Sequence, residues 1–128
     1  MQPILWQIYT PIKTTAMSQK YKSLVLNLAV KEMTFTSAAI QTDGNKIMAT
    51  LSYSGLESDA ITSKLLQSID NINYSDVPDS LVTIDKRVPS HTWNVNGLVH
   101  GCFIKVSVTV PFGTSEGTFD LFNLLAHD

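Results

Sequence analysis

The sequence predicts an α+β fold that is mainly β, an antiparallel meander sheet followed by one C-terminal helix. Its clearest strand precedes Pro111, which ends it because proline has no backbone N–H for a sheet ladder. Upstream of it, other stretches also alternate apolar and polar residues, and downstream of it apolar residues recur at the spacing of a helix. These three observations carry the prediction. In the clearest strand, one face holds Ile104, Val106, Val108 and Val110, and the other holds Phe103, Lys105, Ser107 and Thr109.

Length and charge indicate one domain with no strong preference for an acidic or basic partner. The chain has 128 residues and a net charge of −2, enough for one modest core. A nucleic-acid-binding domain is usually net basic, so such binding would depend on a local patch or on many copies. No apolar run approaches the ~18 residues of a membrane span, and the lone Cys102 excludes an internal disulfide. We expect a single domain over residues 21–128 and no membrane partner.

The N-terminal arm, residues 1–20, shows no regular period and is interrupted by two prolines. Terminal segments are commonly mobile unless they are tied down. Docking of the arm, on this subunit or on a neighbouring one, is left open. The residues that suit such packing are Trp6, Ile8 and Tyr9.

Three strands are predicted in succession after the arm. Ser23–Val30 and Met33–Thr36 alternate on either side of a Lys31-Glu32 turn. Thr42–Asn45 contains Asp-Gly and Gly-Asn, which tolerate positive φ in tight turns. Ile47–Tyr53 alternates again, so the three form a meander.

The secondary structure of the middle of the chain is predicted less clearly. Ser58–Ile72 has apolar residues at helical spacing but reads equally as a strand, and periodicity leaves both open. Asn73–Ser80 is rich in turn formers. Leu81–Val88 reads as a strand stopped by Pro89. Ser90–Gly101 is a long connection with room for a short strand or a flexible tip.

The last segment predicts a helix. Thr114 or Ser115 suits the N-cap position, and Glu116 places a negative charge in the first turn, where it complements the helix dipole. The helix would present a broad apolar side formed by Phe119, Leu121, Phe122, Leu124 and Leu125.

The sequence contains no catalytic motif, so we expect neither an enzyme nor a cofactor. A phosphate loop, an HExxH motif and a nucleophile elbow are all missing. His91, His100 and Cys102 lie near one another in sequence, but further ligands at suitable spacing are lacking, and we expect no metal. Asp76, Asp79 and Asp85 are candidates for a carboxylate pair, but turn and surface roles explain them better.

Two features keep alternatives open. Trp93 is either a core anchor or an interface residue, because large aromatics are favoured at subunit contacts. Lys86, Arg87 and Lys105 belong either to an ordinary solvated sheet face or to a surface that meets the phosphates and bases of single-stranded RNA.

The order of these signals resembles the coat proteins of single-stranded RNA bacteriophages, the levivirus-like family. Thr83–Pro89 is similar to a family strand that ends in a Val-Pro step, and Ile104–Ser115 is similar to the last strand and the entry to the helix. Met33–Thr36 and Ile47–Tyr53 are similar to the second and third strands. The chain departs from the family by having room for one C-terminal helix instead of two, and by about twenty extra residues before the first strand.

The resemblance implies an N-terminal hairpin, a strand over Ile61–Asp70, and an intertwined homodimer in which each helix packs over the partner. It also implies a face that lines the shell interior and binds RNA. That face consists of Thr83, Asp85, Arg87, Phe103, Lys105 and Ser107. The implied subunit interface consists of Trp93, Asn96, Phe119, Phe122 and Leu125.

The function that this resemblance implies is structural. The chain would be a capsid protein that dimerises, closes an icosahedral shell around single-stranded viral RNA, and assembles in the cytoplasm of a bacterial host into a virion. The alternative is a small viral matrix-type or nucleic-acid-binding protein that does not close a shell.

Overall fold

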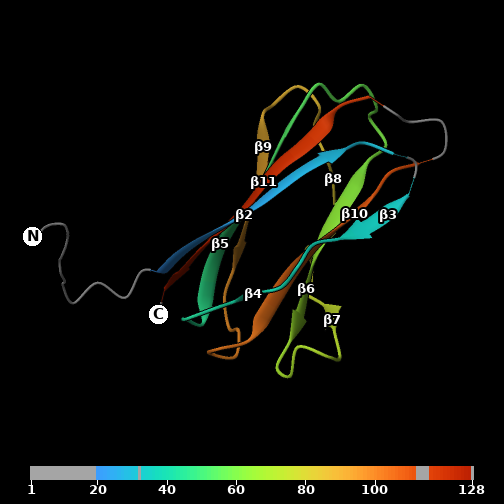
Figure 1. The fold of residues 1–128 in the computed structure, drawn as a ribbon. Helices are drawn as coiled ribbons and strands as arrows, with labels where there is room; N and C mark the ends of the chain where they lie inside the picture. The colour runs from blue at the N-terminus through green and yellow to red at the C-terminus, as the bar shows by residue number, and fades with distance from the viewer. Residues whose placement is uncertain (1–19, 32, 112–115, 128) are drawn as a thin grey trace, which may run out of the picture.

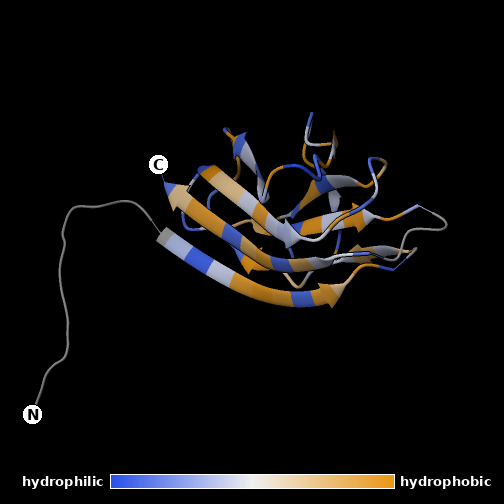
Figure 2. Ribbon diagram, turned by 90° about the horizontal axis from the view of Figure 1, so that it is seen from above, coloured by the Kyte–Doolittle hydropathy of each residue, from blue (hydrophilic) through white to orange (hydrophobic). Residues whose placement is uncertain are grey.

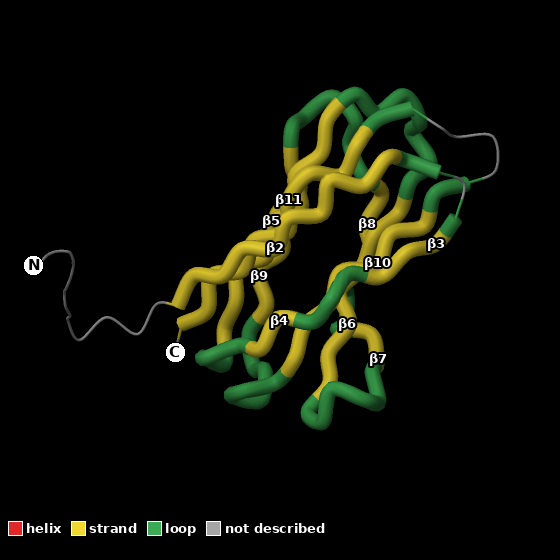
Figure 3. The backbone as a smooth tube through the Cα atoms, in the orientation of Figure 1, coloured by secondary structure: helices red, strands yellow, loops and turns green. Residues whose placement is uncertain are grey.

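Two antiparallel sheets packed face to face make up the structure. The computed structural model describes residues 20–31, 33–111 and 116–127, and within these ranges every regular element is a strand (Figures 1 and 3). The predicted arm therefore lies outside the described residues except for Lys20, and so do the predicted capping residues Thr114 and Ser115.

The first sheet has four strands, and one of its two edge strands is long. Its order is β2-β11-β5-β9, and neighbouring strands are antiparallel. The two outer strands are unequal, because β2 has ten residues and β9 has six. The strands are β2 (Lys20–Ala29), β11 (Thr118–His127), β5 (Lys46–Ser54) and β9 (Ser90–Val95).

The second sheet has two long central strands and short pieces on both sides. β10 (Phe103–Thr109) pairs with β6 (Thr62–Ser68) along its whole length. On one side β10 also pairs with β3 and β4, and on the other side β6 pairs with β7 and β8. The short strands are β3 (Thr34–Thr36), β4 (Ile40–Gln41), β7 (Ser75–Asp76) and β8 (Val82–Thr83).

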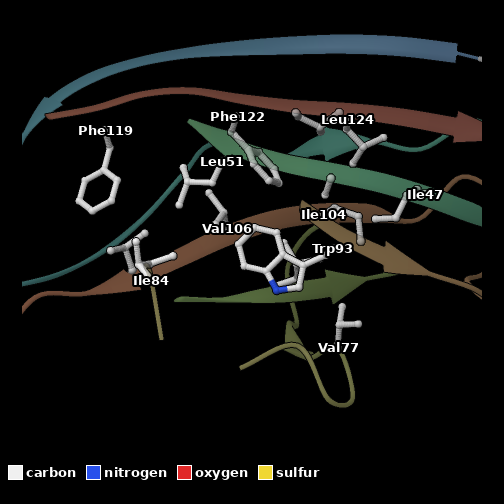
Figure 4. Close-up of a cluster of buried hydrophobic side chains, with 14 of the residues drawn as sticks. Ile47, Leu51, Val77, Ile84, Trp93, Ile104, Val106, Phe119, Phe122 and Leu124 are labelled. Atoms are coloured by element: carbon white, nitrogen blue, oxygen red, sulfur yellow. The ribbon is translucent and has the colours of Figure 1, made fainter. Parts of the chain in front are cut away.

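The core lies between the sheets and is filled by the inward side of each strand's alternation (Figure 4). Ile104, Val106 and Val108 are each 0 % exposed, which confirms the predicted apolar face of the clearest strand. Phe119 of β11 anchors one end, with its ring centroid 5.5 Å from that of Phe35 and 6.3 Å from that of Tyr53. The tilted arrangement of these rings is favourable for aromatic pairs.

The predicted C-terminal helix is wrong, and with it the α+β fold class. Thr118–His127 is a strand between β2 and β5. Phe119 and Leu121 flank Asp120 on β11 but face the adjacent residues Tyr53 and Ser52 on β5, so Asp120 is the extra residue of a bulge. The bulge shifts the alternation by one, and the buried side then holds Phe119, Phe122, Leu124 and Ala126. The three-residue step that imitated a helix is the bulge.

The predicted meander and N-terminal hairpin are also wrong. β2 and β3 follow each other in sequence but belong to different sheets, since β2 pairs with β11 and β3 pairs with β10. The chain crosses between the layers after Val30, whose N–H donates to Gly117 O at 3.0 Å. Alternation assigns each side chain to a face, but it does not identify the strand that lies alongside.

Three other segments have mixed outcomes. The strand reading of Ile61–Asp70 is confirmed by β6. The strand predicted over Leu81–Val88 is wrong beyond Thr83, because Asp85 Oδ1 accepts from Arg87 N at 2.9 Å in a turn. The short strand for which Ser90–Gly101 had room is present as β9.

Candidate functional site

The predicted RNA-binding face is part of the outer surface of the second sheet. Phe103, Lys105 and Ser107 follow one another on the outward side of β10, although Ser107 is only 6 % exposed. Thr83 lies two strands away, paired with Thr62 of β6. The structure therefore brings the three β10 residues together and places Asp85 and Arg87 in the turn after β8.

The cations of this face are engaged by neighbouring side chains. Lys105 Nζ lies 4.4 Å from the ring centroid of Tyr74, a cation–π contact. Arg87 Nε lies 3.0 Å from Asp85 Oδ1. The hydrogen bond from the Arg87 side chain lowers the pKa of Asp85 below its usual range. A carboxylate held ionised within the predicted face opposes phosphate binding.

The predicted interface residues divide into buried and accessible groups. Trp93, Phe119 and Phe122 are enclosed within one chain, at 5 %, 0 % and 0 % exposed. The Trp93 indole Nε1 donates to Ser80 O at 2.7 Å, so this residue is a core anchor. Asn96 is exposed and Leu125 is half-buried, which leaves these two accessible to a partner.

The described residues hold no group of three or more His, Cys, Asp or Glu side chains that would bind a metal. Burial lowers the pKa of His91, whose ring lies edge-on to Trp93 at 4.6 Å. Burial also raises the pKa of the Cys102 thiol, which lies 3.7 Å from Thr42 Oγ1. None of the described ranges forms a helix long and apolar enough to cross a membrane.

The free edge of β2 is the most unusual surface of the described structure. β2 ends the strand order of its sheet, so among the described residues only β11 pairs with it, along one side. Its outward side chains include Tyr21 and Val25, each 64 % exposed, and Leu28 is 40 % exposed. Figure 2 shows this strand at the edge of the sandwich, beginning where the grey trace ends, with its apolar residues in the half farther from that trace.

The other edges of the described sheets are short or polar. β3 has three residues, and β4, β7 and β8 have two each. β9 has six residues, most of them polar. Proteins commonly shorten or charge their edge strands to prevent pairing with other chains. β2 differs from them because it is long and its middle, Leu24–Leu26, is apolar. It also carries Lys20 and Lys22 near its start, and an irregularity in its pairing at Asn27, whose φ is 46°.

Near the start of β2, an ion pair connects the edge of the first sheet to the second sheet. Lys22 Nζ lies 3.2 Å from Asp43 Oδ2 and donates to Gln41 O at 2.6 Å, which links β2 to the end of β4 across the gap between the sheets. Because both charged groups are about two-fifths exposed, we attribute little stability to the pair. Its position matters more, since it leaves only the other end of the rim open.

At that open end lies an apolar groove between β2 and β3. It has a volume of about 300 Å³. Its floor reaches the core, because Phe35 packs against the fully buried Phe119. Met33 is 50 % exposed on its rim. The groove is lined by Leu28, Ala29, Lys31, Met33 and Phe35.

Sequence reasoning missed both β2 and this groove as a candidate site. A signal was present, because Ser23–Val30 has apolar residues at both sets of alternating positions: Leu24, Leu26 and Leu28 on one, Val25 and Ala29 on the other. A strand that is apolar on both faces is typical of a strand covered on both faces. In the described structure only its inner face is covered.

No family model and no curated protein matches this sequence. Among solved structures, the fold is similar to a protein of Bacillus endospore appendages, a family of disulfide-linked pili, with a TM-score of 0.52, 9 % identity, and coverage of 92 % of this chain and 98 % of that chain. A carbohydrate-binding module in complex with β-1,4-galactotriose gives a TM-score of 0.45, 16 % identity, and coverage of 84 % and 81 %. An exo-β-1,3-galactanase from Phanerochaete chrysosporium with galactose gives a TM-score of 0.39, 13 % identity, and coverage of 85 % and 27 %. None of the three is an RNA-phage coat protein, and at these identities the likeness concerns the β-sandwich fold alone.

Proposed function

We propose that this chain is a structural subunit that associates with copies of itself by adding a strand from a neighbouring copy to the free edge of β2. The observation that carries the proposal is a ten-residue edge strand with an apolar middle, Leu24–Leu26, and an unpaired outer side among the described residues. Strand addition at an open sheet edge is a general mode of protein association, in which backbone hydrogen bonds supply affinity and side-chain pockets supply specificity.

The chemistry of the edge supports this association. Residues along an antiparallel strand direct their N–H and C=O groups alternately to either side, so about half of those on β2 point away from β11. Each intermolecular backbone hydrogen bond adds roughly 0.5–1.5 kcal/mol. Burial of Val25 and Leu28, now 64 % and 40 % exposed, adds a hydrophobic contribution.

The association is non-covalent. The Bacillus protein of similar fold belongs to a family of disulfide-linked pili, whereas this chain has one cysteine, Cys102, which is 2 % exposed. A buried thiol does not reach a neighbouring copy. The proposal therefore rests on β2 and not on that likeness.

RNA packaging, a virion and the matrix-type alternative stay predictions from the sequence. Of these predictions we keep self-association and omit RNA binding. The reason is electrostatic, since Tyr74 contacts Lys105 and Asp85 pairs with Arg87 on the face where RNA was expected.

The test is a charge on the edge strand. In Val25→Lys a charge would lie next to the incoming strand and would lose water when the strands pair, so we expect self-association to weaken at least tenfold. Light scattering coupled to size-exclusion chromatography, with negative-stain electron microscopy, measures the assembled fraction of the parent and the variant.

The matched control is Met48→Lys. Met48 is 43 % exposed on the outer face of the same sheet, but it lies on the inner strand β5. Unchanged association in this variant separates edge pairing from stacking of sheet faces. A parent chain that stays monomeric at every concentration tested would contradict the proposal, and so would association that survives Val25→Lys but not Met48→Lys.

A further inference from the structure

We infer that the strand added to β2 is the N-terminal segment Ile4–Tyr9 of a second copy of this chain, seated in the groove between β2 and β3. The inference rests on the proposed function and names the partner segment. It is carried by the apolar groove at the open end of the rim, and by a short apolar segment that the sequence supplies before β2.

The groove suits an apolar side chain that enters from the rim. The side chains of Leu28, Met33 and Phe35 line it, and Phe35 lies against the fully buried Phe119. A side chain inserted here extends the core of the sandwich. The groove also adjoins the unpaired backbone of β2, so one extended segment can fill it and hydrogen-bond to the edge at the same time.

The segment Ile4–Tyr9 has the composition of such a strand. Although the first 20 residues as a whole lack a period, Ile4, Trp6 and Ile8 occupy alternate positions here. Pro3 and Pro11 bracket the segment, and prolines are tolerated only at the ends and edges of strands. The segment carries no charge. Trp6 is its largest side chain, and tryptophan is enriched among residues that dominate binding energy at interfaces.

A second copy is a better donor than the same chain. From Lys20 to the groove at Leu28 is roughly 26 Å, eight strand residues at about 3.3 Å each. To cover this distance along its own β2, the chain would reverse direction just before Lys20. Tight reversals between strands use Gly, Asn or Asp, and residues 16–19 (Ala-Met-Ser-Gln) contain none of them. A neighbouring copy needs no such turn.

The segment that follows β10 in sequence, residues 112–115, is a less suitable occupant. Val110 N donates to Met33 O at 2.9 Å, so the chain passes the groove shortly before Phe112. Residues 112–115 offer one large apolar side chain. They are too few to pair with the length of β2, whereas Ile4–Tyr9 supplies both apolar side chains and strand backbone.

Donation of the arm to the next copy makes the contact heterologous, because two different surfaces meet. A heterologous contact generates a ring when its rotation closes and an open filament when it does not. Two copies that exchange arms about a two-fold axis make the same contact reciprocally, so we expect swapped dimers, rings or filaments.

The experiment is cysteine trapping between differently tagged full-length chains. One chain carries a single new cysteine at one position from 4 to 9, and the other carries Met33→Cys. The native Cys102 stays in place because it is 2 % exposed. After co-expression and oxidation, only an intermolecular disulfide joins the two tags. We expect yields that alternate along positions 4 to 9 and that reach at least ten times those of the control pair.

The control replaces Met33→Cys with Ile72→Cys. Ile72 is also apolar and is 80 % exposed, but it lies in the loop after β6, next to the opposite end of β10. Equal yields with both partners would overturn the inference. So would disulfides that form only within a chain carrying both Ile8→Cys and Met33→Cys, or a high yield of an internal bridge between Phe112→Cys and Met33→Cys.

The experiments distinguish an error in the arm inference from an error in the proposed function. In one outcome the parent assembles, Val25→Lys abolishes assembly, and no arm position gives a disulfide yield above that of the control pair. The edge of β2 then pairs with an element other than the arm, and only the arm inference is wrong. If the parent stays monomeric, both fall.

Discussion

Asp70 organises the loop between β6 and β7. Its Oδ1 accepts from Ile72 N at 2.9 Å and Asn73 N at 2.8 Å, and its Oδ2 accepts from Asn73 Nδ2 at 2.9 Å. Ser68 Oγ adds a further donor at 2.7 Å. The backbone hydrogen bonds from Asn73 and Ile72 are the main cause of a strongly lowered pKa for this carboxyl. The loop is therefore held by the ionised form of one exposed side chain.

This arrangement predicts a pH-dependent contribution to stability. Because the folded pKa lies below the ordinary value of about 3.9, the contribution is complete above pH ~4 and is lost as the pH falls through the folded pKa. We expect Asp70→Ala to melt at a lower temperature than the parent at pH 7, and the difference to shrink below pH ~4. Calorimetry of both chains from pH 7 to pH 2 measures this. A difference independent of pH would contradict it.

Trp93 joins β9 to the loop before β8. Its buried indole N–H donates to Ser80 O, so Trp93→Phe removes the donor and part of the ring together. We expect a loss of about 2–4 kcal/mol in the free energy of unfolding. Thr92→Ala is the control, because it removes an exposed hydroxyl contact to Thr50 at 3.0 Å and should cost less than ~1 kcal/mol. Urea unfolding compares the two, and equal losses would exclude a core role for Trp93.

Among the elements, β11 shows how one residue changes the reading of a segment. The bulge at Asp120 separates Phe119 from Phe122 by three positions while keeping both in the core. Ser54 Oγ donates to Asp120 Oδ2 at 3.2 Å, which ties the bulged residue to the neighbouring strand. A bulge of this kind bends the strand and increases its twist.

The strand assignment predicts losses of different size at two neighbouring leucines. Leu124 is 0 % exposed and faces the core, whereas Leu125 is half-buried on the outer face. We expect Leu124→Ala to lower the free energy of unfolding by about 2–5 kcal/mol and Leu125→Ala by less than ~1 kcal/mol. Chemical denaturation measures both. A helix would place both on its apolar side, so similar losses would speak against β11.

For the molecule as a whole, the long edge strand β2 predicts that apparent stability depends on protein concentration. Association that occurs only in the folded state stabilises it by mass action, by up to about 1.4 kcal/mol for each tenfold rise in concentration. For a domain of this size we expect Tm to rise by roughly 3–6 °C per tenfold step.

Thermal melts of the parent and of Val25→Lys over a hundredfold concentration range measure this dependence. The variant, which associates at least tenfold more weakly, should show a smaller rise in Tm over the same range. A parent Tm that does not change with concentration would argue against association through the folded state.

Several local features followed from the residues alone. The faces of Phe103–Val110, the stop before Pro111, the turn at Thr42–Asn45 and the strand over Ile47–Tyr53 agree with β10, β5 and the bends that precede it. These features depend on backbone geometry within a few residues, because a strand alternates its side chains and proline lacks an N–H. The turn at Thr42–Asn45 forms without the positive φ that Asp-Gly tolerates.

Long-range packing decided the remainder. The spacing of Phe119, Phe122 and Leu124 fits either a helix or a bulged strand. Pairing of β11 with β5 and β2 decides for the strand. The separation of β2 from β3 and the open groove between them depended on which strands pair across the sandwich. Alternation places a side chain on a face, but a strand's partner, or the lack of one, is set by contacts between residues far apart in the chain.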